Sequence, residues 1–260
     1  MTVLDRLADY ARQRTEAEKN ELPFNELRRQ AEQLPKKVFE FENALKKEEI
    51  SFICECKKAS PSKGIIAPDF PYLEIARDYE GAGADCISVL TEPKWFLGSD
   101  EYLSEIAANV SIPCLRKDFT VDEYMIYKAR IIGASAVLLI CSILDEARIK
   151  EYINIFDSLG LSALVEAHDE NEVVSAQRAR AKIIGVNNRN LKDFSVDTKN
   201  SARLKSLVSN NVLFVSESGV KTRADVEKLI EIGADAVLVG ETLMRAKNKT
   251  AALKELKGIV

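Results

Sequence analysis

Charged and amide side chains stand at the ends of several short apolar runs in this 260-residue sequence. After the run 51–54, Glu55 and Lys57 lie two residues apart and share a face with Ile53, because alternate side chains of a strand point to the same side. The ends of four further runs carry Lys117, Glu166, Asn187 with Arg189, and Glu217. Lysines and glutamates gathered at one place can donate and remove protons near neutral pH.

We expect crowding to perturb the pKa values of these groups. Neighbouring lysines lower each other's pKa from about 10.4, and clustered carboxylates raise theirs from about 4. Such shifts would place an acid and a base near neutrality. The only histidine, His168, follows the run that ends in Glu166, and we interpret it as a surface or substrate-positioning residue. Proton transfer therefore falls to lysine and glutamate.

Two plainer interpretations stay open for these side chains. Any one of them could turn into solvent at the end of its strand, although the recurrence of the pattern on five runs weakens that interpretation. Glu55 and Lys57 could also neutralise each other as a buried ion pair without a chemical role.

The elements that must position these groups alternate between apolar runs and helical patterns. Eight runs predict strands at 51–56, 86–90, 113–117, 136–140, 163–167, 182–187, 212–217 and 236–240. The phrases "GADCISVL", "GASAVLLI" and "GADAVLVG" repeat, and their glycines at 83, 133 and 233 fit the left-handed position after a helix. The pattern predicts an α/β fold, a (β/α)8 TIM barrel with catalytic groups at the C-terminal ends of its strands. A doubly wound open sheet is the alternative, but we find no glycine fingerprint of the kind that accompanies it.

Residues 1–48 stand outside this alternation and predict a helical N-terminal extension of the catalytic barrel, 49–260. Amphipathic patterns indicate helices at 4–13, 23–33 and 39–49. We favour helices that cap the barrel or pack on its side. The alternative is that they close over the mouth of the active site.

Composition limits the class of protein and its partners. Hydrophobic residues make up 46% of the chain, and its net charge is −4, so we expect a globular protein that binds no nucleic acid. Apolar runs are too short to cross a membrane, and the charged N-terminus lacks a signal-peptide pattern, which predicts a cytoplasmic location. The five cysteines include no CxxC pair and are expected to be core residues in a reducing compartment. No motif implies a cofactor or a metal.

The loops after the last two predicted strands suggest a handle for the substrate. They read "SESGVKT" and "VGETLM", and Ser218, Gly219 and Gly240 would leave backbone N–H groups open to an anion. Barrels often bind phosphate with these two loops. The glycines could also be plain turn residues, but their placement favours a phosphate group on a small-molecule substrate.

Seven motifs together resemble the indole-3-glycerol phosphate synthase family of the tryptophan pathway. They are "ECKKASPSKG", "LTEPKWFLGSDEYL", "LRKDF", "VEAHDENE", "IIGVNNRNL", "VSESG" and "LVGETLMR", and they run from about residue 50 to residue 245. The resemblance implies a stand-alone carboxy-lyase. Its reaction closes the indole ring of 1-(2-carboxyphenylamino)-1-deoxyribulose 5-phosphate and releases carbon dioxide and water.

The resemblance also implies a role for each site residue. Lys117 corresponds to the general acid and Glu166 to the base, with Glu55 and Lys57 assisting dehydration and holding the carboxylate. Asn187 and Arg189 would position the substrate, supported by Glu217. Contacts to polar substrate groups, chiefly the phosphate, would come from Ser60, Ser218, Gly219 and Gly240. Contacts to the aromatic ring would come from Phe96 and Phe119, for which ordinary packing is nearly as good an explanation.

Two residues depart from the pattern of some relatives, and rival functions remain. His168 stands where some relatives carry Asn, and Glu241 stands beside the phosphate loop where others carry Ser. We expect Glu241 to point away and to contribute only its backbone. The rivals are a Schiff-base aldolase, a phosphoribosylanthranilate isomerase and a non-catalytic phosphate-binding barrel. We expect a monomer, and a weak association with other enzymes of the pathway is a further expectation.

Overall fold

Parallel strands close into a barrel in the computed structural model, which describes residues 2–190 and 195–259. In these residues the barrel has eight strands: β1 (Ser51–Cys56), β4 (Cys86–Leu90), β5 (Cys114–Lys117), β6 (Ala136–Ile140), β7 (Ser162–Ala167), β8 (Ile183–Asn187), β9 (Leu213–Glu217) and β10 (Ala236–Val239). Neighbours in the chain are neighbours in the sheet, and β1 pairs with both β4 and β10. The predicted (β/α)8 fold is therefore confirmed.

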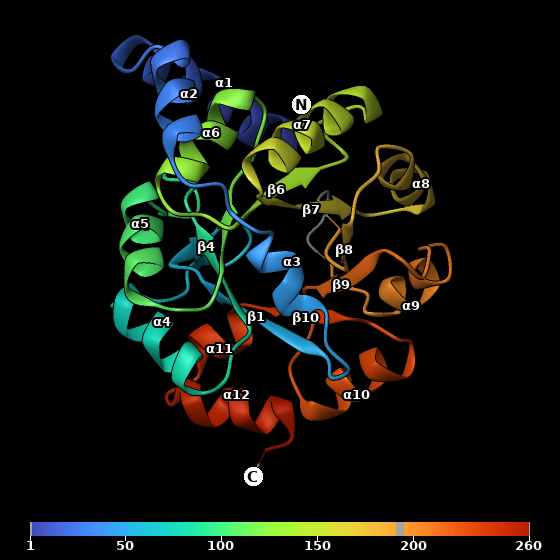
Figure 1. Ribbon diagram of the computed structural model, residues 1–260. Helices are drawn as coiled ribbons and strands as arrows, with labels where there is room; N and C mark the ends of the chain where they lie inside the picture. Colours follow the sequence, from blue (N-terminus) through green and yellow to red (C-terminus); the bar gives the residue numbers. More distant parts are fainter. Residues whose placement is uncertain (1, 191–194, 260) are drawn as a thin grey trace.

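Helices form a ring around the strands (Figure 1). They are α4 (Tyr72–Gly81), α5 (Asp100–Asn109), α6 (Glu123–Ile131), α7 (Glu146–Leu159), α8 (Glu170–Arg178), α9 (Lys199–Lys205), α10 (Arg223–Glu231), α11 (Glu241–Arg245) and α12 (Lys249–Lys257). Side-chain oxygens at residues such as Asp122 and Asp169 cap their first turns. The repeated glycines at 83, 133 and 233 all have positive φ, of 87°, 93° and 74°, as the repeat predicts.

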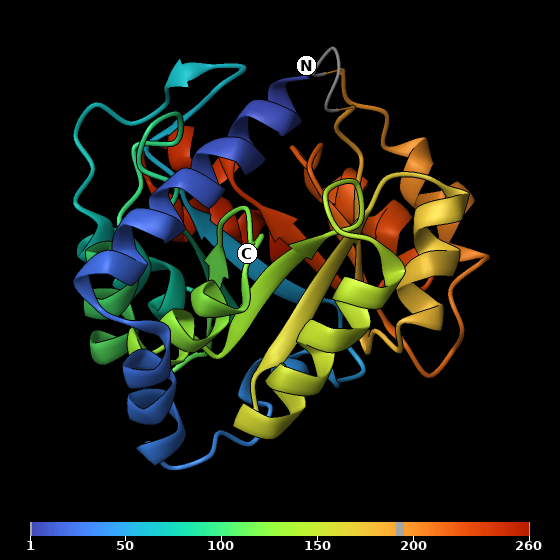
Figure 2. The same cartoon turned by 90° about the horizontal axis from the view of Figure 1, so that it is seen from above.

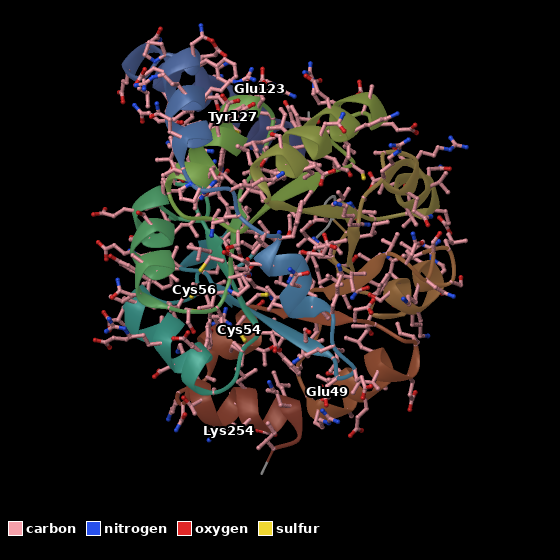
Figure 3. The ribbon with its side chains drawn as sticks, viewed as in Figure 1. Glu49, Cys54, Cys56, Glu123, Tyr127 and Lys254 are labelled. Atoms are coloured by element: carbon pink, nitrogen blue, oxygen red, sulfur yellow. The ribbon has the colours of Figure 1, made fainter. Side chains whose placement is uncertain are left out.

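The alternation of side chains along the strands separates two apolar layers. Ile53, Leu115 and Leu164 belong to the cluster inside the barrel, whereas Cys54 and Cys56 belong to the layer between strands and helices (Figure 3). The five cysteines are all free thiols, and four of them are buried. Because Ile53 faces inward, Glu55 two residues later also faces the barrel axis, at its C-terminal end.

The first three helices of the described chain take different positions on the barrel: the first and third lie at opposite ends, and the second packs on the side, where Phe24 meets Tyr127 of α6 edge-on. They are α1 (Val3–Glu21), α2 (Phe24–Gln33) and α3 (Glu40–Leu45). Helix α3 inserts Phe41 and Leu45, both fully buried, into the interior cluster at the N-terminal end of the strands. Figure 2 shows α1 across the opposite end, on the side of the short hairpin β2 (Ala59–Ser60) and β3 (Gly64–Ile65).

Ion pairs and aromatic contacts fasten α1 to the loops at that end. Arg14 donates to the buried carboxylate of Asp118 at 2.8 Å, and Asp118 directly follows Lys117 in the chain. The ring of Tyr10 meets Trp95 edge-on, with centroids 5.4 Å apart. None of the helices in residues 2–190 and 195–259 combines the length and the apolar character needed to span a membrane.

Burial of Phe41 at the N-terminal end of the barrel predicts that this residue contributes to stability. Phe41→Ala should lower the free energy of unfolding by about 3–5 kcal/mol, because it leaves a cavity in a fully buried layer. Val38→Ala, three residues earlier and 67% exposed, is the matched control and should change it by less than about 0.5 kcal/mol. Urea unfolding followed by circular dichroism measures both, and equal midpoints would contradict the role of Phe41.

Candidate active site

One cavity of about 700 Å³ lies at the C-terminal ends of the strands. Its wall includes every site residue predicted from the sequence: Glu55, Lys57, Ser60, Phe96, Lys117, Phe119, Glu166, Asn187, Arg189, Glu217, Ser218, Gly219, Gly240 and Glu241. Period-2 alternation directs the residues on the strands, such as Glu55, Lys117 and Glu166, toward the barrel axis at the same level, and the segments that follow the strands supply the others. Helix α1 adds Val3, Leu4 and Leu7, which the sequence patterns did not single out.

At the centre of the cavity, the ammonium group of Lys117 lies between two carboxylates. Its Nζ atom is 3.4 Å from Oε2 of Glu166 and 3.7 Å from Oε2 of Glu217. Both carboxylates are almost fully buried, whereas the side chain of Lys117 keeps 15% of its exposure toward the cavity. A cation that is paired inside the protein and open on one side can donate a proton to a bound molecule.

The pKa of Lys117 departs from the expectation. Burial alone would lower it, but the charges of Glu166, Glu217 and Glu55 outweigh burial and raise the pKa above its ordinary range. The prediction of a lowered lysine pKa is therefore wrong for Lys117, because the charges of these three carboxylates outweigh the effect of burial. Lys117 is a protonated acid at neutral pH.

The pKa values of the two neighbouring carboxylates are shifted in opposite directions. Burial would raise the pKa of Glu166, yet the charges of Lys117 and His168 and a hydrogen bond to Asn187 lower it. For Glu217, burial and the negative charge of Glu166 raise the pKa to about 8. The expectation of raised carboxylate pKa values is thus right for Glu217 and wrong for Glu166. At neutral pH the structure holds an ionised Glu166 beside a protonated Glu217.

Two glycines make room for the carboxylates. A Cβ atom at Gly185 would lie 2.1 Å from Oε1 of Glu217, and one at Gly240 would lie 2.2 Å from Oε1 of Glu55. Glu55 also forms an ion pair with Lys57 within the cavity wall. Gly240, predicted as a phosphate contact, therefore also has a packing role, because any larger residue would displace this pair.

Asn187 ends β8 beside Glu166, and Arg189 follows two residues later. The side-chain oxygen of Asn187 accepts the backbone N–H of Arg189 at 3.0 Å, while its amide group stabilises ionised Glu166. Asn188 turns the other way and bonds to Ser201 behind the strand. The alternation predicted from the sequence thus selects Asn187 and Arg189 for the cavity.

The end of the cavity near β9 and β10 carries backbone turns and cations. Ser218 and Gly219 both have positive φ, of 66° and 99°, and form the turn after β9. Glu241 does not point away as expected. Its carboxylate accepts from Nε of Arg245 at 2.9 Å and lies 4.0 Å from Nη2 of Arg189, because these cations attract it to the cavity rim. With Lys63, these arginines make the rim basic, which suits an anion.

An aromatic wall closes the other side of the cavity. The rings of Phe96 and Phe119 lie 6.0 Å apart between centroids. The loop that carries Phe96 is held by Glu92, a fully buried carboxylate that accepts the backbone N–H groups of Lys94, Trp95 and Phe96. The backbone of the loop at Phe96 is therefore held in place by Glu92.

Metal ligation receives no support from the described residues. Among residues 2–190 and 195–259, no group of three or more His, Cys, Asp or Glu side chains is placed to hold a metal ion. His168 lies behind Glu166, outside the wall of the main cavity.

Comparisons with known proteins assign the family. The sequence model of the indole-3-glycerol phosphate synthase family matches residues 4–256. The indole-3-glycerol phosphate synthase of Ruminiclostridium cellulolyticum is 57% identical over 257 residues, covering 98% of this chain and 99% of the relative. That of Endomicrobium trichonymphae is 51% identical over 256 residues, with coverage of 98% and 99%.

Solved structures with low identity share the barrel. A 3-hexulose-6-phosphate synthase superposes with a TM-score of 0.63 at 19% identity, over 81% of this chain and 100% of that chain. A phosphoribosylanthranilate isomerase of Thermotoga maritima gives 0.58 at 16% identity, with the same coverage. At this level of identity the likeness concerns the fold alone.

The raised pKa of Glu217 predicts a pH-dependent stability. From pH 4.5 to about 8 the folded protein keeps a proton that the unfolded chain releases, so this group lowers the free energy of unfolding as pH rises. Glu217→Gln has no carboxyl group to titrate and so avoids this loss. At pH 8 its free energy of unfolding should be higher than that of wild type by more than about 1.4 kcal/mol, the value of one pKa unit. The gain should vanish near pH 4.5. Urea unfolding at several pH values measures it, with the exposed Glu231→Gln as control, and a pH-independent difference would contradict the assignment.

Proposed function

The chain belongs to the indole-3-glycerol phosphate synthase family, and we propose that its cavity closes the indole ring of 1-(2-carboxyphenylamino)-1-deoxyribulose 5-phosphate with loss of carbon dioxide and water. It is thus a carboxy-lyase of tryptophan biosynthesis. The observation that carries the proposal is the ammonium group of Lys117, held between Glu166 and Glu217 and open to the cavity.

The two ends of the cavity suit the two ends of this substrate. Phe96 and Phe119 offer an apolar wall to the aromatic ring. At the other end, the turn of Ser218 and Gly219 and the basic rim around Arg189 offer N–H groups and positive charge to the phosphate. A volume of about 700 Å³ lies within the usual range for sites that bind small molecules.

Ring closure would begin with Lys117 as the general acid. The aromatic carbon that bears the carboxylate attacks the ketone carbon, and the ketone oxygen takes a proton from Nζ of Lys117 to become a hydroxyl group. The attack leaves an iminium-like electron sink, so the bond to the carboxylate breaks toward the ring and releases carbon dioxide. The raised pKa of Lys117 supports this role, because the proton is present at neutral pH.

Dehydration would need a base for the proton that is lost next to the new ring bond. Glu166 is ionised and buried beside the acid, which supports this assignment. The hydroxyl group takes a proton from Lys57 of the Glu55–Lys57 pair and leaves as water. The same pair holds the substrate carboxylate before carbon dioxide departs. Protonated Glu217 would support the position of Lys117 and Glu166, and Asn187 would orient the substrate.

The rival functions fit the geometry less well. A Schiff-base aldolase needs a neutral amine, whereas three carboxylates favour the charged form of Lys117. A purely phosphate-binding barrel gives no reason to bury Glu55, Glu166 and Glu217 together at a cost in stability. Four further expectations stay predictions. They are a cytoplasmic location, a monomeric state, an association with other enzymes of the pathway, and a boundary at residue 48 between the N-terminal extension and the barrel.

Removal of the acid tests the proposal directly. Lys117→Ala should lower the rate of formation of indole-3-glycerol phosphate by about 10²–10⁴, because it removes the ammonium group that lies beside Glu166 and Glu217 and would donate the proton. Indole fluorescence after addition of the substrate measures the rate, with the exposed Lys150→Ala on α7 as control. Activity within a few-fold of wild type would refute the assignment. A covalent adduct on Lys117 after borohydride treatment would instead favour an aldolase.

Replacement of the base separates proton transfer from binding. Glu166→Gln keeps the shape of the side chain, so KM should stay within a few-fold while kcat falls by about 10²–10⁴. Steady-state kinetics at saturating substrate measures both, provided that chemistry limits turnover. An unchanged kcat under that condition would remove Glu166 from the mechanism.

A further inference from the structure

The only histidine of the sequence, His168, bridges two carboxylates behind the cavity. Its Nδ1 atom lies 3.0 Å from Oε2 of Glu172, and its Nε2 atom lies 3.4 Å from Oε1 of Glu166. The backbone N–H of His168 also donates to Glu172 at 2.7 Å, which fixes the start of α8 against the end of β7. The imidazole is therefore held in one orientation, with Nε2 directed at Glu166.

The hydrogen bonds of Glu172 determine the state of the other ring nitrogen. An ionised carboxylate only accepts, so Nδ1 carries a proton and donates it to Glu172, which also accepts from the hydroxyl group of Ser142. Nε2 is buried and has no hydrogen-bond partner within residues 2–190 and 195–259. Without a proton between them, the lone pair of Nε2 and the oxygen of Glu166 would repel each other.

Several charged groups face this pair from neighbouring elements. Lys117 on β5 approaches Oε2 of Glu166, Glu217 on β9 lies beyond Lys117, and Glu172 comes from α8. Burial lowers the pKa of His168, but the hydrogen bond to Glu172 and the charges of Glu166, Glu172 and Glu217 raise it above its ordinary value. The same proximity lowers the pKa of Glu166.

We propose that His168 is a positioning residue whose imidazolium group directs Nε2 at Oε1 of Glu166 and keeps that carboxylate ionised. The histidine charge approaches Oε1 and leaves Oε2 to face Lys117 and the substrate. The catalytic consequence rests on the proposed function of Glu166 as the base, whereas the charge interaction itself does not.

Nuclear magnetic resonance can test the interaction between His168 and Glu166 without any substrate. In protein without a histidine tag, the single imidazole gives one set of ring signals, whose pH titration reports the pKa of His168 alone. Glu166→Gln and Glu172→Gln should each lower this pKa by about one unit, because each removes a neighbouring negative charge. Glu170→Gln, on the same helix but exposed, should leave it unchanged. A titration of Glu166→Gln that matches wild type would overturn the proposal.

Kinetics can test the effect on the base. On the acidic side of the pH–rate profile, the pH at which activity falls should be about one unit higher in His168→Asn than in wild type, because removal of a nearby cation raises the pKa of Glu166. A merely structural role would lower kcat at every pH and leave this pH unchanged, and that result would overturn the proposal. If wild type formed no indole product, the proposed function would fail, but the resonance titration would still decide whether His168 and Glu166 interact.

Discussion

The arrangement of the cavity depends on one buried cation between two carboxylates. Lys117 keeps Glu166 ionised although Glu166 is almost fully buried. Glu217 stays protonated because burial and the negative charge of Glu166 disfavour its ionised form. Glu166 could not stay ionised at this depth without a neighbouring cation, because a single charge buried alone is strongly unfavourable. Glu217 needs no such partner, since burial alone already raises its pKa. The barrel supplies what this triad requires: strand ends at one level, and a rigid wall that leaves one side open.

The strand ends were predictable because they follow a short-range rule. Side chains alternate along a strand, so Ile53 in the core fixes Glu55 toward the axis, and Leu164 does the same for Glu166. The protonation states were not predictable, since they depend on distances between strands far apart in the chain. Lys117 meets three carboxylates, while Lys57 is engaged with Glu55, and nothing in the sequence order states which cation neighbours which anion.

The contribution of α1 marks another limit of sequence patterns. An amphipathic period shows which face of a helix is buried, but it does not show which end of a barrel that face covers. Here Leu4 and Leu7 line the cavity, whereas Phe41 on α3 closes the opposite end. Arg245 was missed for a similar reason: it lies one helical turn after Glu241, and only the fold directs both to the rim.

The two crowded glycines have a consequence for anyone who wishes to redesign this barrel. At positions 185 and 240 the space that a methyl group would fill already belongs to carboxylate oxygens of Glu217 and Glu55. Libraries that diversify strand ends to obtain new activities should therefore keep both positions fixed, or vary each together with its opposing glutamate. The lack of a side chain at these two positions is what leaves room for Glu217 and Glu55 at the cavity.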